Sequence, residues 1–141
     1  MSVARDQIVR FLNQYLEINQ VEDPYCANGL QVQGNEEIKK IIFGVSASLE
    51  FFKKAQAVDA DMMVVHHGIF WGKTFTQLTR EKYKRVKFLM DHDLNLANYH
   101  LPLDRHITVG NNAALCRTLG LAMVDYFDAY GWRGTTVGIS L

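Results

Sequence analysis

The sequence predicts an α/β domain in which strand–helix–strand units form a three-layer-like arrangement around a mostly parallel sheet. Short apolar runs of strand length alternate along the chain with segments whose apolar residues recur at helical spacing. The length of 141 residues and the hydrophobic content of 48% suit one domain with a packed core. We therefore expect a single domain over residues 1–141, with right-handed crossovers between its parallel strands.

An amphipathic helix is expected to open the chain over residues 5–16. Its apolar positions, which keep helical spacing, are Ile8, Phe11, Leu12, Tyr15 and Leu16. Asp23-Pro24 stops any continuation of this helix, and Asn28-Gly29 marks a tight turn. The first strand is therefore expected only after this turn.

The first strand–helix–strand unit is expected over residues 38–65. Apolar residues cluster at 38–45 and 62–65, which predicts two buried strands. Between them, residues 49–58 have apolar side chains at helical spacing, and Ser46 or Ser48 suits the position that caps the start of a helix.

Two further units follow the first. The second has a helix over 79–91 and a strand over 94–99, and the third has a helix capped by Asn111 or Asn112 before an apolar stretch at 121–124. The core-facing side of the helix over 79–91 is expected to hold Tyr83, Val86, Leu89 and Met90. The last seven residues, 135–141, alternate polar and apolar side chains, which predicts a half-buried strand that a partner or a longer chain completes.

Charge and composition argue against several classes of partner. Fifteen basic and fifteen acidic residues give a formal net charge of zero, so no overall basic field favours direct binding to nucleic acid or to an anionic membrane. The apolar runs are far shorter than a membrane span, and the first residues lack an apolar signal region, so we expect a cytoplasmic protein. Cys26 and Cys116 stand far apart in the chain and form no CxxC pair, which is typical of two reduced thiols.

Polar residues gather at three points where a predicted strand ends. These are Ser46-Ala-Ser48, His66-His67-Gly68 and the segment from His100 to His106. Ligands of parallel sheets collect beyond the carboxyl ends of the strands. Because the strands are expected to be parallel, all three points should open onto the same edge of the sheet.

His66, His67 and Asp104 are the candidate metal ligands. Adjacent imidazoles can reach two ions, and a carboxylate on the neighbouring loop can bind one ion or bridge both. The sequence therefore predicts a dinuclear centre with two divalent ions, and its donor atoms suit zinc, iron or manganese. The alternative is a structural histidine pair whose rings bind backbone carbonyls.

The sequence predicts less specific roles for the remaining histidines and for the aromatic residues. His100 and His106 flank Asp104 and could be further ligands, partners of ligands, proton shuttles or plain hydrogen-bonding groups, whereas His92 suits the end of a helix. The aromatic pair in residues 68–72 could wall a pocket or stack on a flat substrate, or it could pack in the core. The basic run at 80–87 keeps helical spacing and is expected to be a solvated helix face.

Several segments in the same order resemble the Nif-three-like family, whose members are also described as GTP cyclohydrolase I type 2 homologues. These segments are Asn28-Gly29-Leu30-Gln31-Val32, His66-His67-Gly68-Ile69-Phe70-Trp71, His100-Leu101-Pro102-Leu103-Asp104 and Gly110-Asn111-Asn112. The resemblance extends from the first helix to about residue 121, and the combination of segments is specific.

The resemblance implies an α/β fold of two related halves, of which this chain corresponds to the first. It also implies a dinuclear metal centre in a cleft and a ring-shaped homohexamer whose sites face the interior. The family's histidine pair and aspartate fall on His66, His67 and Asp104. The family takes a further His and Glu from a motif near its carboxyl terminus, and this chain ends before any such motif. We therefore expect residues 1–141 to be the amino-terminal part of a longer, two-lobed protein.

A metal-dependent hydrolase is the function that the resemblance and the residues favour together. A metal would lower the pKa of a bound water, and the hydroxide would attack the C8 atom of a purine or another electrophile while His100 moves the proton. The substrate would be a small molecule such as a nucleotide or a related heterocycle. The alternatives are a metal-binding protein without turnover and an interaction scaffold, including a partner of a transcription factor.

Overall fold

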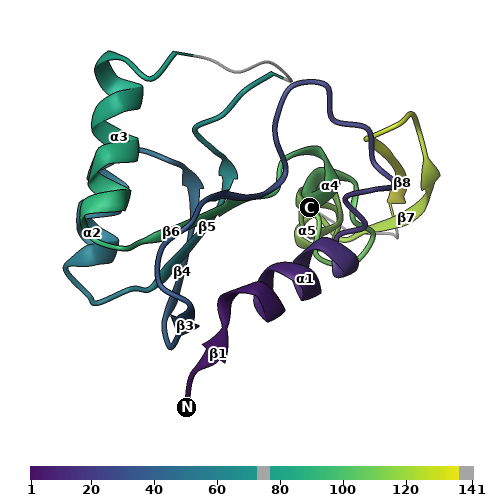
Figure 1. Ribbon diagram of the computed structural model, residues 1–141. Helices are drawn as coiled ribbons and strands as arrows, with labels where there is room; N and C mark the ends of the chain where they lie inside the picture. The colour runs from purple at the N-terminus through teal and green to yellow at the C-terminus, as the bar shows by residue number, and fades with distance from the viewer. Residues whose placement is uncertain (73–76, 137–141) are drawn as a thin grey trace. The chain divides into compact units, whose positions relative to one another are not determined.

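The computed structural model describes residues 1–72 and 77–136, and it divides into two compact units at His100 (Figure 1). The first unit contains β1 (Val3–Ala4), α1 (Arg5–Tyr15), β2 (Gly29–Val32), β3 (Glu37–Ile38), β4 (Ile41–Ser46), α2 (Leu49–Gln56), β5 (Met62–His67), α3 (Arg80–Asp91) and β6 (Asn95–Asn98). The second contains α4 (Leu101–Arg105), α5 (Asn111–Thr118), β7 (Leu121–Tyr126) and β8 (Trp132–Thr136). None of the helices that these residues form is long and apolar enough to cross a bilayer.

A four-stranded sheet in the order β2-β6-β5-β4 forms the centre of the first unit. The three strands β4, β5 and β6 are parallel, and β2 joins the edge antiparallel to β6. β1 and β3 make a separate antiparallel pair. The predicted α/β class with a mostly parallel sheet is therefore confirmed.

Helices cover both faces of this sheet. α2 and α3 lie side by side on one face and α1 lies on the other (Figure 1). Met63, Val65 and Leu96 point from the strands into a core that Phe52 of α2 and Leu89 of α3 complete. On the other side of the sheet, the Tyr99 hydroxyl donates a hydrogen bond of 2.9 Å to the side-chain oxygen of Asn13 in α1.

The prediction of one continuous strand over 38–45 is wrong, because β3 ends at Ile38 and β4 begins only at Ile41. The backbone N–H groups of Lys39 and Lys40 donate to the Asp61 carboxylate, at 2.7 and 2.9 Å, instead of extending a ladder. The tight turn expected at Asn28-Gly29 is also wrong, since Gly29 is the first residue of β2 and adopts a φ of +98° there.

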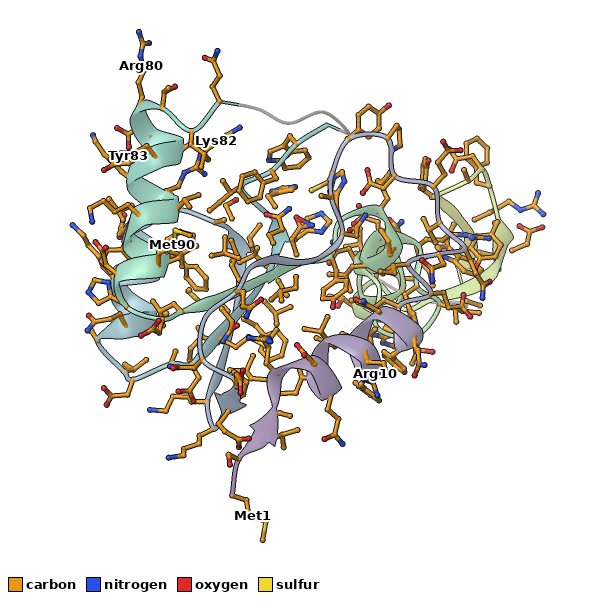
Figure 2. The ribbon with its side chains drawn as sticks, in the orientation of Figure 1. Met1, Arg10, Arg80, Lys82, Tyr83 and Met90 are labelled. Carbon is orange, nitrogen blue, oxygen red and sulfur yellow. The ribbon has the colours of Figure 1, made fainter. Side chains whose placement is uncertain are left out.

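The capping serine of α2 was predicted correctly, but the core face of α3 was predicted only in part. Ser48 Oγ accepts a hydrogen bond from the backbone N–H of Phe51. In α3, Val86 and Leu89 are buried, whereas Tyr83 and Met90 are exposed, because only a narrow stripe of the helix meets the sheet. Most of the basic run is a solvated face, as expected: Lys84 and Lys87 make exposed ion pairs with Glu81 and Asp91, and Arg80 projects from the end of the helix (Figure 2). Arg85 is the exception, because it donates to the Ala47 carbonyl at 2.9 Å.

The second unit departs from the expected third strand–helix–strand unit. β7 does not extend a parallel sheet but pairs antiparallel with β8. A tight turn joins the two strands, where Asp128 Oδ1 accepts the backbone N–H groups of Tyr130 and Gly131. These two bonds lower the pKa of the Asp128 carboxyl. Residues 137–141 of the predicted last strand lie outside the described residues.

The predicted cap of α5 is also wrong. Gly110 occupies the capping position and makes no side-chain bond there. The Asn111 side chain donates to the Asp104 carboxylate at 2.7 Å, and the Asn112 side chain donates to the backbone oxygens of Asp104 and Tyr130.

Candidate metal centre

Three histidines meet at the carboxyl ends of two adjacent parallel strands. His66 and His67 are the last two residues of β5, and His100 follows β6 by two residues. One ligand nitrogen of each ring lies within 4.8 Å of those of the other two. The ring centroids are 4.4 Å apart for His66 and His67, 5.1 Å for His66 and His100, and 5.7 Å for His67 and His100.

The pairing of β5 with β6 explains why residues more than 30 positions apart meet here. Val65 stands opposite Asn98, and the N–H of Tyr99 donates to the Val65 carbonyl at 2.9 Å. The residues that come next, His66 in one chain segment and His100 in the other, therefore lie at the same edge of the sheet. The predicted convergence of strand ends holds, although the histidine pair lies inside the end of β5 rather than after it.

His66 is oriented by a backbone carbonyl. Its Nδ1 lies 3.0 Å from the carbonyl oxygen of Tyr99, which can only accept a hydrogen bond. The proton of a neutral His66 ring therefore sits on Nδ1, and the lone pair sits on Nε2. Metal-ligating histidines usually bind such a partner through the second ring nitrogen.

His67 lies next to the end of β4. Its Nδ1 is 3.5 Å from the hydroxyl of Ser46, the residue that pairs with it across the sheet. The structure therefore places two of the three predicted strand ends, those with Ser46 and with the histidine pair, side by side.

His100 has a carboxylate partner that sequence reasoning missed. Its Nδ1 lies 3.0 Å from Oδ2 of Asp23, and the Asp23 and His100 side chains are only 2% and 14% exposed. The available signal was the turn itself, because an aspartate often accepts the backbone N–H groups two and three residues later. Asp23 Oδ1 does so with Tyr25 and Cys26.

Two amide side chains, one half-buried and one fully buried, hold the loop that follows the histidine pair. The side-chain oxygen of Gln31 accepts from the backbone N–H groups of Ile69 and Phe70, at 2.8 and 3.3 Å. Asn98, which is fully buried, accepts from the N–H of Gly68 and from the Cys26 thiol, each at 2.9 Å. Burial, reinforced by the nearby Asp23 charge, raises the pKa of the Cys26 thiol to about 11. This cysteine is therefore a protonated structural group at neutral pH.

The aromatic pair in this loop divides between two roles. Phe70 packs against the core, whereas the Trp71 ring lies 5.1 Å from His100 and 5.8 Å from His67, centroid to centroid. A hollow of about 400 Å³ lies beside the Trp71 ring. The residues that line it include Ser46, Ser48, His67, Trp71, Glu81 and Arg85. Trp71 thus lines a hollow beside the histidines, which agrees with the prediction that this aromatic pair could wall a pocket. Phe70 agrees with the alternative prediction of core packing.

The other predicted residues belong to other elements of the chain. Asp104 is in α4 of the second unit, where its carboxylate accepts from Asn111, and its role as a metal ligand stays a prediction. His106 Nδ1 accepts hydrogen bonds from the backbone N–H groups of Thr108 and Val109, and so stabilises the loop that follows it. His92 ends α3 and binds the Phe88 carbonyl at 2.8 Å, which agrees with its expected place at a helix end.

The donor atoms of the three-histidine cluster fit a transition metal. Imidazole nitrogens suit zinc, iron and copper, and the carbonyl and carboxylate partners on Nδ1 leave the Nε2 lone pairs of His66 and His100 for a ligand bond. Both cysteines are free thiols, and neither belongs to the histidine cluster. The cluster therefore offers nitrogen donors and no thiolate, unlike a thiolate-rich structural zinc site.

Comparisons with known proteins show the family to which the chain belongs. The family model described as Duf34/NIF3 (NGG1p interacting factor 3) matches residues 3–140. A protein of Archaeoglobus fulgidus named GTP cyclohydrolase 1 type 2 homolog is 46% identical over 134 residues, which are 95% of this chain and 53% of that protein. A protein of Deinococcus radiodurans with the same name is 41% identical over 138 residues, which are 98% of this chain and 51% of that protein.

Solved structures have the same fold. The crystal structure of TTHA1606 from Thermus thermophilus is similar with a TM-score of 0.85 and 38% identity, over 92% of this chain and 53% of that chain. Protein ybgI, described as of unknown function, has a TM-score of 0.85 and 36% identity, over 90% of this chain and 51% of that chain. The chain thus spans about half the length of the relatives that it matches. It belongs to the Duf34/NIF3 family.

Proposed function

We propose that this chain supplies the imidazole ligands of a dinuclear metal centre in a hydrolase that acts on a nucleotide or a related heterocycle. The observation that carries the proposal is the meeting of His66, His67 and His100, with one ligand nitrogen of each within 4.8 Å of the others. The name GTP cyclohydrolase 1 type 2 homolog, given to relatives that are 41% and 46% identical, supports the substrate class. Asp104 is proposed as the carboxylate ligand on the strength of the family motif.

Divalent ions at this site would supply Lewis-acid activation of a water molecule. The chain's own residues position the reactants. His66 and His67 hold the centre at the strand ends, and Trp71 offers a flat apolar wall against which a heterocycle can stack. The hollow beside His67 gives such a ring room to lie next to the centre.

His100 can serve this site in either of two ways. The lone pair on its Nε2 can bind a metal, or it can accept a proton from the reacting water. A His100→Ala variant distinguishes them. If His100 is a ligand, the variant loses metal; if His100 moves the proton, the variant keeps its metal and loses turnover.

Elemental analysis of the purified chain tests the metal centre. The chain is incubated with zinc, passed over a desalting column and compared with the His66→Ala, His67→Ala and Asp104→Ala variants. His92→Ala is the matched control, because His92 is an exposed histidine directly after α3. We expect metal in the wild type and in the control, and a loss of metal in the other three variants. A wild type without metal, or a His66→Ala variant that retains all of it, would refute the proposal.

A second candidate function, an interaction scaffold, is favoured by an exposed apolar strip on β4. Phe43 and Val45 are 71% and 67% exposed on a strand that forms an edge of the sheet. Such an edge suits a protein partner or a further copy of the chain, as in the hexamer that the family resemblance implies. The test is sedimentation of Phe43→Glu beside His66→Ala: a scaffold keeps its assembly in His66→Ala and loses it in Phe43→Glu.

A further inference from the structure

We infer that Asp23 is a positioning residue that fixes the tautomer and the direction of the His100 ring within the histidine cluster. The inference concerns the imidazole itself, and it rests on the proposed function only for its consequence, which is the binding of a metal. All of the residues involved belong to the first unit.

The contact between the two side chains determines the tautomer. Asp23 Oδ2 lies 3.0 Å from His100 Nδ1, and an ionised carboxylate only accepts hydrogen bonds. The proton of a neutral His100 ring must therefore sit on Nδ1. The lone pair then sits on Nε2, where either role proposed for His100 needs it.

Asp23 can act in this way because its own position is fixed by several donors. Its Oδ1 accepts the backbone N–H groups of Tyr25 and Cys26, at 3.0 and 3.1 Å. Its Oδ2 accepts from the Asn28 side chain at 2.9 Å in addition to His100. The side-chain oxygen of Asn28 in turn accepts the backbone N–H of His100 at 2.7 Å. The backbone and the ring of His100 are thus held by the same small network.

This network is attached to the loop that carries the other two histidines. Cys26 forms an isolated antiparallel bridge with Trp71, and the N–H of Gly72 donates to the Tyr25 carbonyl at 2.7 Å. The N–H of Ala27 reaches the Phe70 carbonyl at 3.4 Å. Asp23 therefore orients His100 from a segment that is bonded to the chain directly after His66 and His67.

The partner of His100 differs in kind from the partners of its neighbours. His66 binds a carbonyl and His67 lies near a hydroxyl, whereas His100 binds a buried carboxylate. A carboxylate on Nδ1 fixes the tautomer and the direction of the ring, and so presents the Nε2 lone pair to a ligand. Loss of such a partner typically lowers metal affinity by about 10–100-fold.

The Asp23→Asn variant tests this inference because the turn favours one orientation of the new side-chain amide. The two backbone N–H groups of Tyr25 and Cys26 can only donate, so we expect the asparagine oxygen on their side and its NH₂ group on the side of His100. The Asn28 side chain, which donates to the same side, then loses its acceptor. The new NH₂ group donates to Nδ1 and moves the ring proton to Nε2. Asp23→Ala leaves Nδ1 without its carboxylate and is expected to populate both tautomers.

The test is the ring ¹⁵N spectrum of the metal-free chain, with the His100 signals assigned by comparison with His100→Gln. Asp128→Asn is the matched control, because Asp128 accepts backbone N–H groups in the same kind of turn but belongs to the hairpin of β7 and β8. We expect the Nδ1–H tautomer in the wild type and in Asp128→Asn, and the Nε2–H tautomer in Asp23→Asn. A wild type with the proton on Nε2, or an Asp23→Asn variant with an unchanged tautomer, overturns the inference. The wild-type spectrum alone remains decisive if the variants do not fold.

Zinc affinity, measured by calorimetry on the same proteins, separates this inference from the proposed function. We expect a fall of about 10–100-fold in Asp23→Asn and no change in Asp128→Asn. If the tautomer changes as expected but the wild type binds no zinc, the metal centre fails and the role of Asp23 stands. If the wild type binds zinc and the tautomer is the same in Asp23→Asn, the role of Asp23 fails and the metal centre stands.

Discussion

The side-chain oxygen of Asn98 accepts a hydrogen bond of 2.9 Å from the backbone N–H of Gly68, and so connects the end of β6 to the loop that follows the histidine pair. The same oxygen accepts from the Cys26 thiol at 2.9 Å and from the Gln31 amide at 3.4 Å. Asn98 is fully buried, and its oxygen would cost free energy there if these bonds were not made. One side chain therefore couples the two strand ends that carry the histidines.

Replacement of Asn98 by Ala should destabilise the chain and loosen this loop. The N–H of Gly68 would lose its buried acceptor, which costs about 1–3 kcal/mol, and the small cavity left behind adds to this cost. We expect a loss of about 2–4 kcal/mol in the free energy of unfolding, measured with urea. Asn19→Ala, at an exposed position, is the control and should change the free energy by less than about 0.5 kcal/mol. Equal effects of the two substitutions would show that Asn98 does not hold the loop.

Gly68 should not tolerate even a methyl group. A Cβ atom there would lie 2.3 Å from Oε1 of Gln31 and 2.4 Å from Oδ1 of Asn98, and both oxygens are already bonded to this loop. Gly68→Ala must therefore displace the amides and the end of β5 with them. We expect a loss of stability and of zinc binding together.

Gly72→Ala is the comparison for this substitution. Apart from its chain neighbours, no atom of the described residues lies within 4 Å of a Cβ at that position. Among these residues, only the φ of +84° therefore opposes the change, at about 1–2 kcal/mol. Zinc binding should survive in Gly72→Ala. A Gly68→Ala variant that keeps full zinc affinity would contradict the close packing around Gly68.

Much of the site's position was predictable because it follows from strand patterning. The apolar run before His66 predicts a buried strand, and the convergence of parallel strand ends then places His66 and His100 at one edge. The second unit shows where this reasoning stops. An apolar stretch such as residues 121–124 is compatible with a parallel or an antiparallel neighbour, and only the turn at Asp128 makes it a hairpin.

The hydrogen-bond partners of the histidines could not be predicted from sequence patterns, for a different reason. Asp23 and His100 are 77 positions apart, and their contact depends on an irregular segment that no periodicity describes. The Asp-Pro pair was interpreted only as a barrier to continuation of the first helix, which ends earlier, at Tyr15. The same aspartate makes a turn whose buried oxygen faces the cluster. Local turn chemistry can be read from sequence, whereas the group that a turn presents to a distant loop cannot.

The stability of the chain should depend on Cys26 at alkaline pH. Burial raises the pKa of this thiol from 9.0 to about 11. Below pH 9 the thiol is protonated in both the folded and the unfolded chain. Between pH 9 and about 11 the unfolded chain loses the proton first, so the free energy of unfolding should fall as the pH rises.

Cys26→Ser is the matched variant for this pH dependence, because its hydroxyl can still donate to Asn98 but does not titrate. The difference in unfolding free energy between wild type and variant should shift in favour of the variant as the pH rises above 9. Burial also raises the pKa of Tyr99, but that tyrosine is present in both proteins and cancels in the comparison. A difference that does not change with pH would show that the Cys26 thiol ionises as readily in the folded chain as in the unfolded one.

Trp71 should report directly on ion binding at the histidines. Its ring centroid lies 5.1 Å from that of His100 and 5.8 Å from that of His67, so a paramagnetic ion held by these rings lies close enough to quench its fluorescence. Titration of the wild type with Cu²⁺ should lower the emission, and Trp132→Phe should keep this response because Trp71 remains. In the Trp132→Phe background, where Trp71 is the one tryptophan left, His67→Ala should largely abolish the quenching. Strong quenching that persists in this double variant would place the bound ion elsewhere than beside His67 and His100.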